Sequence, residues 1–149
     1  MSFIDDNLMQ GESVIYRTKL HWIIFLLPVI ILIVGILTLG YTDKTIPKII
    51  IIIAIILGIR SLVTYATSEF GITSKRVLIK TGFIQRDSHE ILLGKIEAIE
   101  VSQPVLGRAW NYGTIVIKGT GGSKDPFSNI VNPLEFRKIA QEQIAESQS

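Results

Sequence analysis

The chain contains no cysteine among its 149 residues. A disulfide framework and any cysteine-based metal or redox site are therefore excluded. Histidine occurs only twice, at His21 and His89, so a histidine-rich metal site is excluded by count. An excess of one charge is also lacking, because 15 basic and 13 acidic side chains leave a net charge of only +2. This balance argues against a dedicated nucleic-acid-binding protein, and we expect no nucleic-acid partner.

The sequence also lacks the common catalytic motifs. His89 and Glu90 do not begin an H-E-x-x-H zinc motif, because Leu93 stands where the second histidine is needed. No Gly-x-Ser-x-Gly motif is present. The carboxylates Glu90, Glu97 and Glu100 lie at separate strand positions and are best explained by solvated strand faces. We therefore expect a protein that is not an enzyme and that holds no cofactor and no metal.

A glycine-rich stretch, YGTIVIKGTGGSKDPF at 112–127, raises the question of a phosphate-binding loop. A P-loop requires G-x-x-x-x-G-K-[ST] between a strand and a helix. Here Lys124 follows Ser123 rather than glycine, and the residues after Pro126 are strand-like. The stretch is therefore predicted to be a mobile connector between two strands, in which glycine supplies positive φ angles. Contact of this loop with a lipid headgroup or a partner is a second interpretation.

Hydrophobic residues make up 48% of the chain and are concentrated in residues 22–67. The first run, Trp22 to Gly40, has 19 residues without a charge, which at ~1.5 Å per residue covers roughly the ~30 Å hydrocarbon core of a bilayer. A segment at that depth must be helical, because lipid satisfies no backbone group. Pro28 is expected to kink this helix, and Trp22 and Tyr41 flank it as aromatic residues do at membrane interfaces. A cleaved signal peptide is a poorer explanation, because the run is too long and no A-x-A site follows it.

A second run, KIIIIIAIILGIRSLVTYAT at 48–67, is predicted to be a second spanning helix. The short connector at 41–47 would make a tight hairpin, and the positive-inside rule then predicts that both termini are cytoplasmic. Arg60 is interpreted as a side chain that snorkels near the helix end, with a buried functional charge as the alternative. Ala54 and Gly58 form a small-xxx-small pair that would admit another helix, either from a second copy or from the chain's own first run.

After Glu69 the pattern changes to six short segments of β type. They are 69–73, 76–85, 89–94, 95–103, 114–120 and 127–131. A bend is expected at Thr81 and Gly82, and a bulge is expected in the fourth segment, where the alternation slips. The spacing predicts a sandwich or a strongly bent sheet rather than βαβ units.

The end of the chain carries strong helix signals. Asn132 is the expected N-cap, Pro133 takes the first helical position and Glu135 the third. The apolar positions that follow fall on one face at helical spacing. They are Phe136, Ile139, Ala140 and Ile144. This helix is predicted to cover the open end of the β-unit.

Several stretches resemble one bacterial family. They are GESVIYRTKLHW at 11–22, TSKRVLIKTGFIQR at 73–86, EILLGKIEAIEVSQPVLGRAWNYGTIVIKGTGG at 90–122 and NPLEF at 132–136. Members of this family are small membrane proteins in which a helix hairpin precedes a domain like the pleckstrin-homology (PH) domain. The resemblance implies a membrane α-helical hairpin plus a small PH-like β-sandwich with a C-terminal capping helix. It implies an N-terminal cytoplasmic segment at 1–20, the hairpin at 21–67 and a cytoplasmic PH-like domain at 68–149, in the inner membrane and without known enzymatic activity.

Basic residues gather near the predicted membrane exits, where each contributes about 1 kcal/mol beside an anionic leaflet. The residues expected to face lipid are Arg17, Lys19, Arg60, Lys75, Arg76, Lys80 and Arg86. An electrostatic brace against the membrane, a merely solvated face and a specific headgroup site are the alternatives. The basic motif of phosphoinositide-binding PH domains is not matched, because Val77 and Leu78 follow Arg76.

The stretch PVLGRAWNYG at 104–113 is predicted to be a loop that carries a large apolar area. Aromatic and arginine side chains are typical anchors of protein interfaces. The candidate interaction residues are Ala54, Gly58, Leu106, Arg108, Trp110 and Tyr112. Packing of Trp110 into the domain's own core is an equal alternative.

These observations predict a non-enzymatic, membrane-anchored PH-like scaffold that contacts membrane lipids and binds a second copy of itself or another membrane protein. Binding of anionic lipid headgroups at the cytoplasmic leaflet is the alternative function. An enzyme or transport role would require that the hairpin oligomerise and that Arg60 line a shared path.

Overall fold

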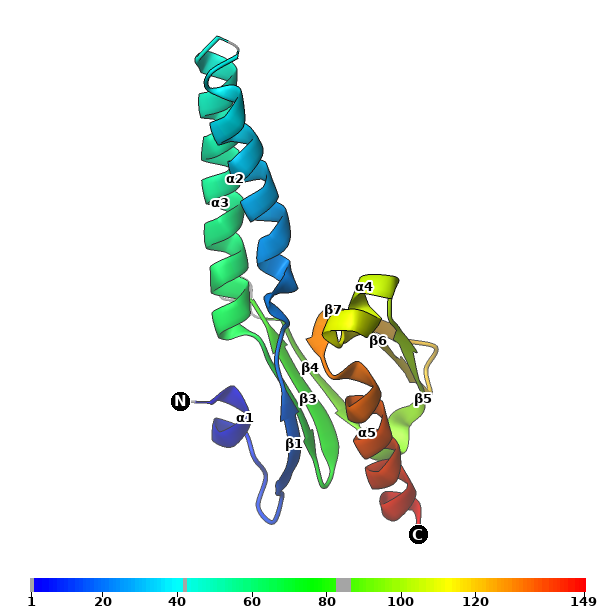
Figure 1. The fold of residues 1–149 in the computed structure, drawn as a ribbon. Coiled ribbons are helices and arrows are strands. Elements are labelled where there is room, and N and C mark those ends of the chain that lie inside the picture. Colours follow the sequence, from blue (N-terminus) through cyan, green and yellow to red (C-terminus); the bar gives the residue numbers. More distant parts are fainter. Residues whose placement is uncertain (1, 42, 83–86) are drawn as a thin grey trace. The chain divides into compact units, whose positions relative to one another are not determined.

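The computed structural model describes residues 2–41, 43–82 and 87–149, and the chain divides into two compact units. The first unit contains Met1–His21 and Thr67–Ser149, and the second contains Trp22–Ala66. Figure 1 shows the helices and strands of both units with their labels.

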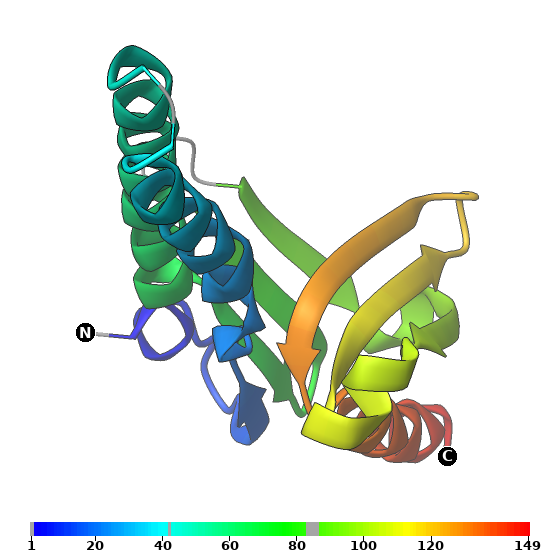
Figure 2. The ribbon, with the colours of Figure 1, turned by 45° about the horizontal axis from the view of Figure 1, so that its top comes forward.

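The first unit is built from two antiparallel sheets and a long C-terminal helix (Figures 1 and 2). One sheet has the strand order β1-β2-β3-β4 and the other has the order β5-β6-β7. The strands are β1 (Val14–Thr18), β2 (Glu69–Thr73), β3 (Arg76–Thr81), β4 (Asp87–Leu92), β5 (Ile96–Ser102), β6 (Tyr112–Gly119) and β7 (Lys124–Val131). The helices are α1 (Phe3–Asp6), η2 (Leu93–Lys95), α4 (Val105–Trp110) and α5 (Pro133–Gln148). This is the predicted PH-like arrangement of a small β-sandwich with a capping helix.

The core of the first unit lies between the two sheets and under α5. Burial alternates along β6, where Ile115 and Ile117 are fully buried, as expected for a strand with one face on a core. The predicted apolar face of α5 is confirmed, because Phe136 and Ala140 are buried and α5 contacts β5, β6 and η2. The register of β5 shifts between Ile96 and Ala98, so the irregularity expected in this strand is also confirmed. Residues 83–86, which include the end of the predicted segment 76–85, lie outside the described residues.

The start of α5 is correct, but the capping interaction expected there is wrong. Asn132 is the residue before the helix and Pro133 is its first residue. However, Asn132 has left-handed backbone angles (φ 51°, ψ 55°) and its side chain makes no cap hydrogen bond. Its side-chain oxygen instead accepts a hydrogen bond from the side-chain amide of Asn111. The cap residue therefore ties α5 to the chain segment that precedes β6.

The N-terminal segment supplies a strand that the sequence pattern did not predict. β1 pairs with β2, so residues before the hairpin belong to the same unit as residues 67–149. The preceding helix α1 packs Ile4 over Gly71, where a β-carbon on Gly71 would lie 2.6 Å from Ile4 Cδ1. The carboxylate of Glu69 accepts hydrogen bonds from the Ser2 hydroxyl and the Ile4 backbone N–H. A domain boundary at residue 68 therefore omits one strand and one helix of the PH-like domain.

The second unit is a pair of helices joined by a short connector. It contains η1 (Trp22–Phe25), α2 (Leu26–Thr38) and α3 (Thr45–Thr67), of which the last residue belongs to the first unit. Pro28 lies in the first turn of α2, where its missing N–H costs no helical hydrogen bond. The kink expected at Pro28 is therefore wrong, because the α-helix simply begins there after a turn of 3-10 helix.

The helix α3 is long and apolar enough to cross a membrane, and it is the only described helix that meets both conditions. The apolar stretch Trp22–Thr38 is shorter. α2 and α3 approach closely at Gly35, where an added β-carbon would lie 2.8 Å from Ile51 Cγ1. Ala54 is buried in the same unit.

Candidate functional site

The most exposed apolar cluster of the first unit lies on the short helix α4. Val105, Leu106 and Trp110 have exposed fractions of 84%, 51% and 42%. Arg108 is also exposed, whereas Tyr112 is buried in β6. Burial of Trp110 in the core is therefore excluded, and Tyr112 is corrected from an interaction residue to a core residue. The loop expected at 104–113 is a helix in its central part.

The position of α4 is set by contacts along its inner side. Gly107 lies so close to the start of β6 that an added β-carbon would stand 2.5 Å from the Tyr112 carbonyl oxygen. The side-chain amide of Gln103 donates hydrogen bonds to the carbonyls of Gly107 and Tyr112, at 3.4 and 3.2 Å. Asn111 ends the helix with φ 57°, in the left-handed region. These contacts hold the inner side of α4 against β6, and its outer face is apolar and exposed.

His21 lies beneath α4 and is buried. Its ring centre is 5.1 Å from that of Tyr112, and the imidazole is hydrogen-bonded to the backbone of Trp110. Its own backbone N–H donates to the Asn129 carbonyl at 2.7 Å. Burial lowers the pKa of His21, and the hydrogen bond to Trp110 offsets only part of this effect. His21 is therefore a neutral packing residue at the base of α4.

Arg76 does not face lipid, and this prediction is wrong. Its guanidinium is 4% exposed and donates to the fully buried carboxylate of Glu12, with an Nε–Oε1 distance of 3.0 Å. It also donates to Glu90 at 2.6 Å and to the Asn7 carbonyl at 2.6 Å. Burial raises the pKa of Glu12, but hydrogen bonds from Arg76 and Thr73 lower it more, and the pKa falls to about 2. Arg76 is a structural residue that neutralises a buried acid.

The other predicted basic residues are spread over different parts of the domain. Lys80 on β3 lies opposite Glu69 on β2, at the end of the sheet where β1 and β2 connect to residues 22–66. Its ammonium lies 5.2 Å from the centre of the Phe3 ring. Lys19 is exposed and follows β1 at the same end of the sheet. Arg17 pairs with Asp5. Lys75 lies at the opposite end of the sheet and donates to the Gln10 carbonyl at 3.2 Å.

The comparison with family models agrees with this fold. A family model described as a bacterial PH domain matches residues 22–145. This chain belongs to the bacterial PH domain family. No curated protein matches. A solved structure that it resembles is a DUF1696 family protein with a pleckstrin-homology domain from Shewanella loihica PV-4, at 10% identity over 95% of this chain and 89% of that one, with a TM-score of 0.48.

In this bacterial PH domain, residues 120–123 of the glycine-rich stretch connect β6 to β7, as predicted. Gly122 has φ +79°, and its N–H donates to the Gly119 carbonyl at 3.1 Å, which closes a tight turn. β7 follows this turn directly, and no helix begins there. A P-loop is therefore excluded by the local structure. The turn borders an open cleft of about 340 Å³ whose other side is β4, with His89 and Asp125 4.0 Å apart.

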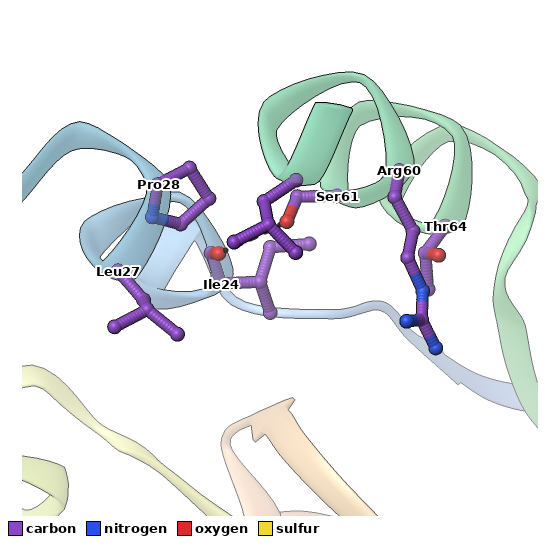
Figure 3. A pocket seen from close by; sticks show the side chains of 7 residues that line it. Ile24, Leu27, Pro28, Arg60, Ser61 and Thr64 are labelled. Atoms are coloured by element: carbon purple, nitrogen blue, oxygen red, sulfur yellow. Dashed lines mark hydrogen bonds between the residues drawn. The ribbon is translucent and has the colours of Figure 1, made fainter. Parts of the chain in front are cut away.

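Within the second unit, a pocket of about 280 Å³ lies between the ends of α2 and α3 (Figure 3). Its lining residues are Ile24, Leu27, Pro28, Leu57, Arg60, Ser61 and Thr64. The hydroxyl of Ser61 donates to the Ile24 carbonyl at 3.3 Å, so it ties α3 to η1, the turn that precedes α2. Arg60 is exposed, and Figure 3 shows its guanidinium extending away from Leu27 and Pro28. Snorkelling of Arg60 beside lipid stays a prediction.

The two small residues of α3, Ala54 and Gly58, differ in how closely their surroundings pack. Ala54 is 3% exposed, and an added β-carbon on Gly58 would lie 3.9 Å from Pro28 Cβ. Ala54 is therefore buried within this unit, whereas a β-carbon at Gly58 would make only an ordinary van der Waals contact, so the structure does not require glycine at this position. Arg86, the last of the predicted basic residues, lies outside the described residues.

Proposed function

We propose that this bacterial PH domain protein is a membrane-anchored module that acts by binding rather than by catalysis. The observation that carries the proposal is the exposed apolar surface of α3, whose most apolar window has a mean hydropathy of 2.4 and is only 6% buried. Exposure of so many apolar side chains to water is unfavourable. A helix of 23 residues extends about 34 Å, which is enough for the ~30 Å core of a bilayer.

The first apolar stretch supports a hairpin that crosses the membrane twice. Trp22–Thr38 extends about 26 Å, which is close to the lower limit for a span. Trp22 and Tyr41 at its ends suit the two interfaces. Lys19 and Lys80, at the end of the β-sheet where the chain connects to the hairpin, would then lie near anionic headgroups, with both termini in the cytoplasm.

A role in binding rather than catalysis is supported by the state of the buried charges. The buried acid of the domain, Glu12, is already paired with Arg76 and hydrogen-bonded by Thr73. The exposed surfaces, by contrast, include an apolar helix and an edge strand, which are features of interaction modules.

The topology can be tested by labelling single cysteines, because the chain has none of its own. We expect an impermeant maleimide to label Tyr41→Cys in intact cells, since the connector would face outward. Ser149→Cys should react only after permeabilisation, and Ala54→Cys, which is buried, should require denaturation. Labelling of Ser149→Cys in intact cells would contradict the proposed topology.

We further propose that the protein self-associates through β4. Among the described strands, β4 pairs only with β3, so its outer edge presents backbone N–H and C=O groups that can template another strand. Leu92 is 52% exposed on this edge. Copies held in one membrane with one orientation have a raised effective concentration, and a symmetric pair is the commonest result.

Native mass measurement in lipid discs tests this association. The wild-type chain is expected to form a dimer, and Leu92→Lys should reduce the dimer fraction by more than half, because a lysine on an edge strand opposes pairing. Leu134→Lys is a matched control, since Leu134 is 48% exposed but lies on α5. A wild-type chain that stays monomeric at all concentrations, or equal effects of the two variants, would contradict association through β4.

A further inference from the structure

The outer face of α4 is apolar and projects from the domain in a fixed direction. Gly107 faces the start of β6, so Val105 and Ala109, two positions to either side, point away from the domain. Leu106 and Trp110 are four residues apart and share one flank of the helix. Three large apolar side chains on six residues form a compact exposed patch rather than scattered single residues.

The contacts of His21 place this patch beside the point where the chain leaves the first unit. The His21 ring packs on Tyr112 and is hydrogen-bonded to the Trp110 backbone. The next residue is Trp22, which begins the apolar stretch Trp22–Thr38. Consecutive Cα atoms are only about 3.8 Å apart. Whatever direction the hairpin takes, its first residue therefore stays close to α4.

We propose that α4 inserts Val105, Leu106 and Trp110 into the boundary between lipid headgroups and acyl chains, as a second membrane contact of the domain. The inference rests on the proposed function, because the bilayer reaches α4 only if Trp22 begins a membrane span. The apolar patch then contacts the same lipid interface at which Trp22 lies, rather than a separate protein. Trp110 matches the residues found at that depth, and Arg108, exposed on the other flank, can reach lipid phosphates.

This second contact would give α4 a mechanical role. A hairpin joined to the domain at His21 and Thr67 leaves the domain free to tilt if nothing else touches the membrane. An inserted α4 would fix one orientation of the domain against the leaflet. Surfaces at the other end of the sheets, such as the cleft beside β4, would then point consistently into the cytoplasm.

The two tryptophans of the chain allow a direct test, because Trp22 and Trp110 are the only ones. The variant Trp22→Phe leaves Trp110 as the sole emitter, and Trp110→Phe leaves Trp22. Each full-length variant is reconstituted into vesicles of equal parts phosphatidylcholine and phosphatidylglycerol, with and without lipids brominated near the headgroup. We expect Trp110 to lose more than half of its emission to the brominated lipid and to be protected from acrylamide in the water.

Two comparisons separate the possible failures. If Trp22 is quenched by brominated lipid and Trp110 only by acrylamide, the insertion of α4 is overturned while the membrane anchor stands. If neither tryptophan is quenched by the lipid, the anchor and the insertion both fail. In the Trp22→Phe background, Leu106→Glu should restore the access of acrylamide to Trp110. Met9→Glu, a substitution at an equally exposed position in the segment before β1, should not, and equal responses of the two variants would overturn the proposal.

Discussion

Replacing Arg76 by alanine is expected to lower the free energy of unfolding of the PH domain by about 3–5 kcal/mol. The reason is the carboxylate of Glu12, whose side chain is fully buried and which would lose the cationic partner that stabilises its charge. The Asn7 carbonyl would lose its guanidinium donor as well. A charge that is left unpaired in a low-dielectric interior costs far more than the pair itself contributes.

Denaturant unfolding of the full chain in detergent, followed by near-ultraviolet circular dichroism, measures this effect. Lys75→Ala is the matched control, because Lys75 is the adjacent residue, is exposed and should change stability by no more than about 0.5 kcal/mol. The double variant Glu12→Leu with Arg76→Met should recover part of the loss, since a well-packed apolar pair often replaces a buried ion pair. Similar stabilities of Arg76→Ala and Lys75→Ala would show that the buried pair is unimportant.

The buried ion pair of Glu12 and Arg76 also predicts that the folded chain loses stability in acid. The pKa of Glu12 is about 2 in the folded chain against 4.5 as its ordinary value, so the folded state favours the ionised form. This contribution is fully present above pH 4.5 and is lost as the pH falls from about 4.5 to about 2. At about 1.4 kcal/mol for each pKa unit, the two values correspond to about 3 kcal/mol.

The measurement compares the unfolding midpoint of the wild type with that of Glu12→Gln across this pH window. The variant is expected to be less stable near neutral pH and to lose less stability in acid, because it carries no carboxyl to protonate. Other groups titrate too, and protonation of the buried His21 costs stability from its ordinary pKa of 6.5 downward. The difference between the two proteins isolates Glu12, and parallel pH curves would contradict its assigned pKa.

The sequence predicted the regular elements well where local patterns determine them. The bounds of β2 agree with the predicted segment 69–73, and α5 begins at Pro133 as its helix signals indicate. β1 was missed because it is a short segment whose partner among the described strands is β2, more than fifty residues later in the chain. α4 was missed because a six-residue helix that contains a glycine and follows a proline has the local pattern of a loop.

The candidate site was harder to predict, because it depends on contacts between distant residues. Nothing local distinguishes Arg76 from the exposed Lys75, since the partner that buries Arg76 is Glu12, in the N-terminal segment. The exposure of Trp110 and the burial of Tyr112 are likewise decided by Gly107 and Gln103, which hold α4 against β6. The apolar surface itself was predictable from PVLGRAWNYG, but its location beside His21 was not.

The pairing of β1 with β2 has a consequence for the order of events during synthesis. Both helices of the hairpin lie between these neighbouring strands in the sequence, so β1 leaves the ribosome well before its partner exists. The first sheet cannot be completed until the whole hairpin has been made, and closing so long a connection carries an entropic cost. Until then β1 has an unpaired edge that can bind other strands. Residues 14–18 therefore stay open to wrong pairing for the time that residues 22–67 take to be synthesised.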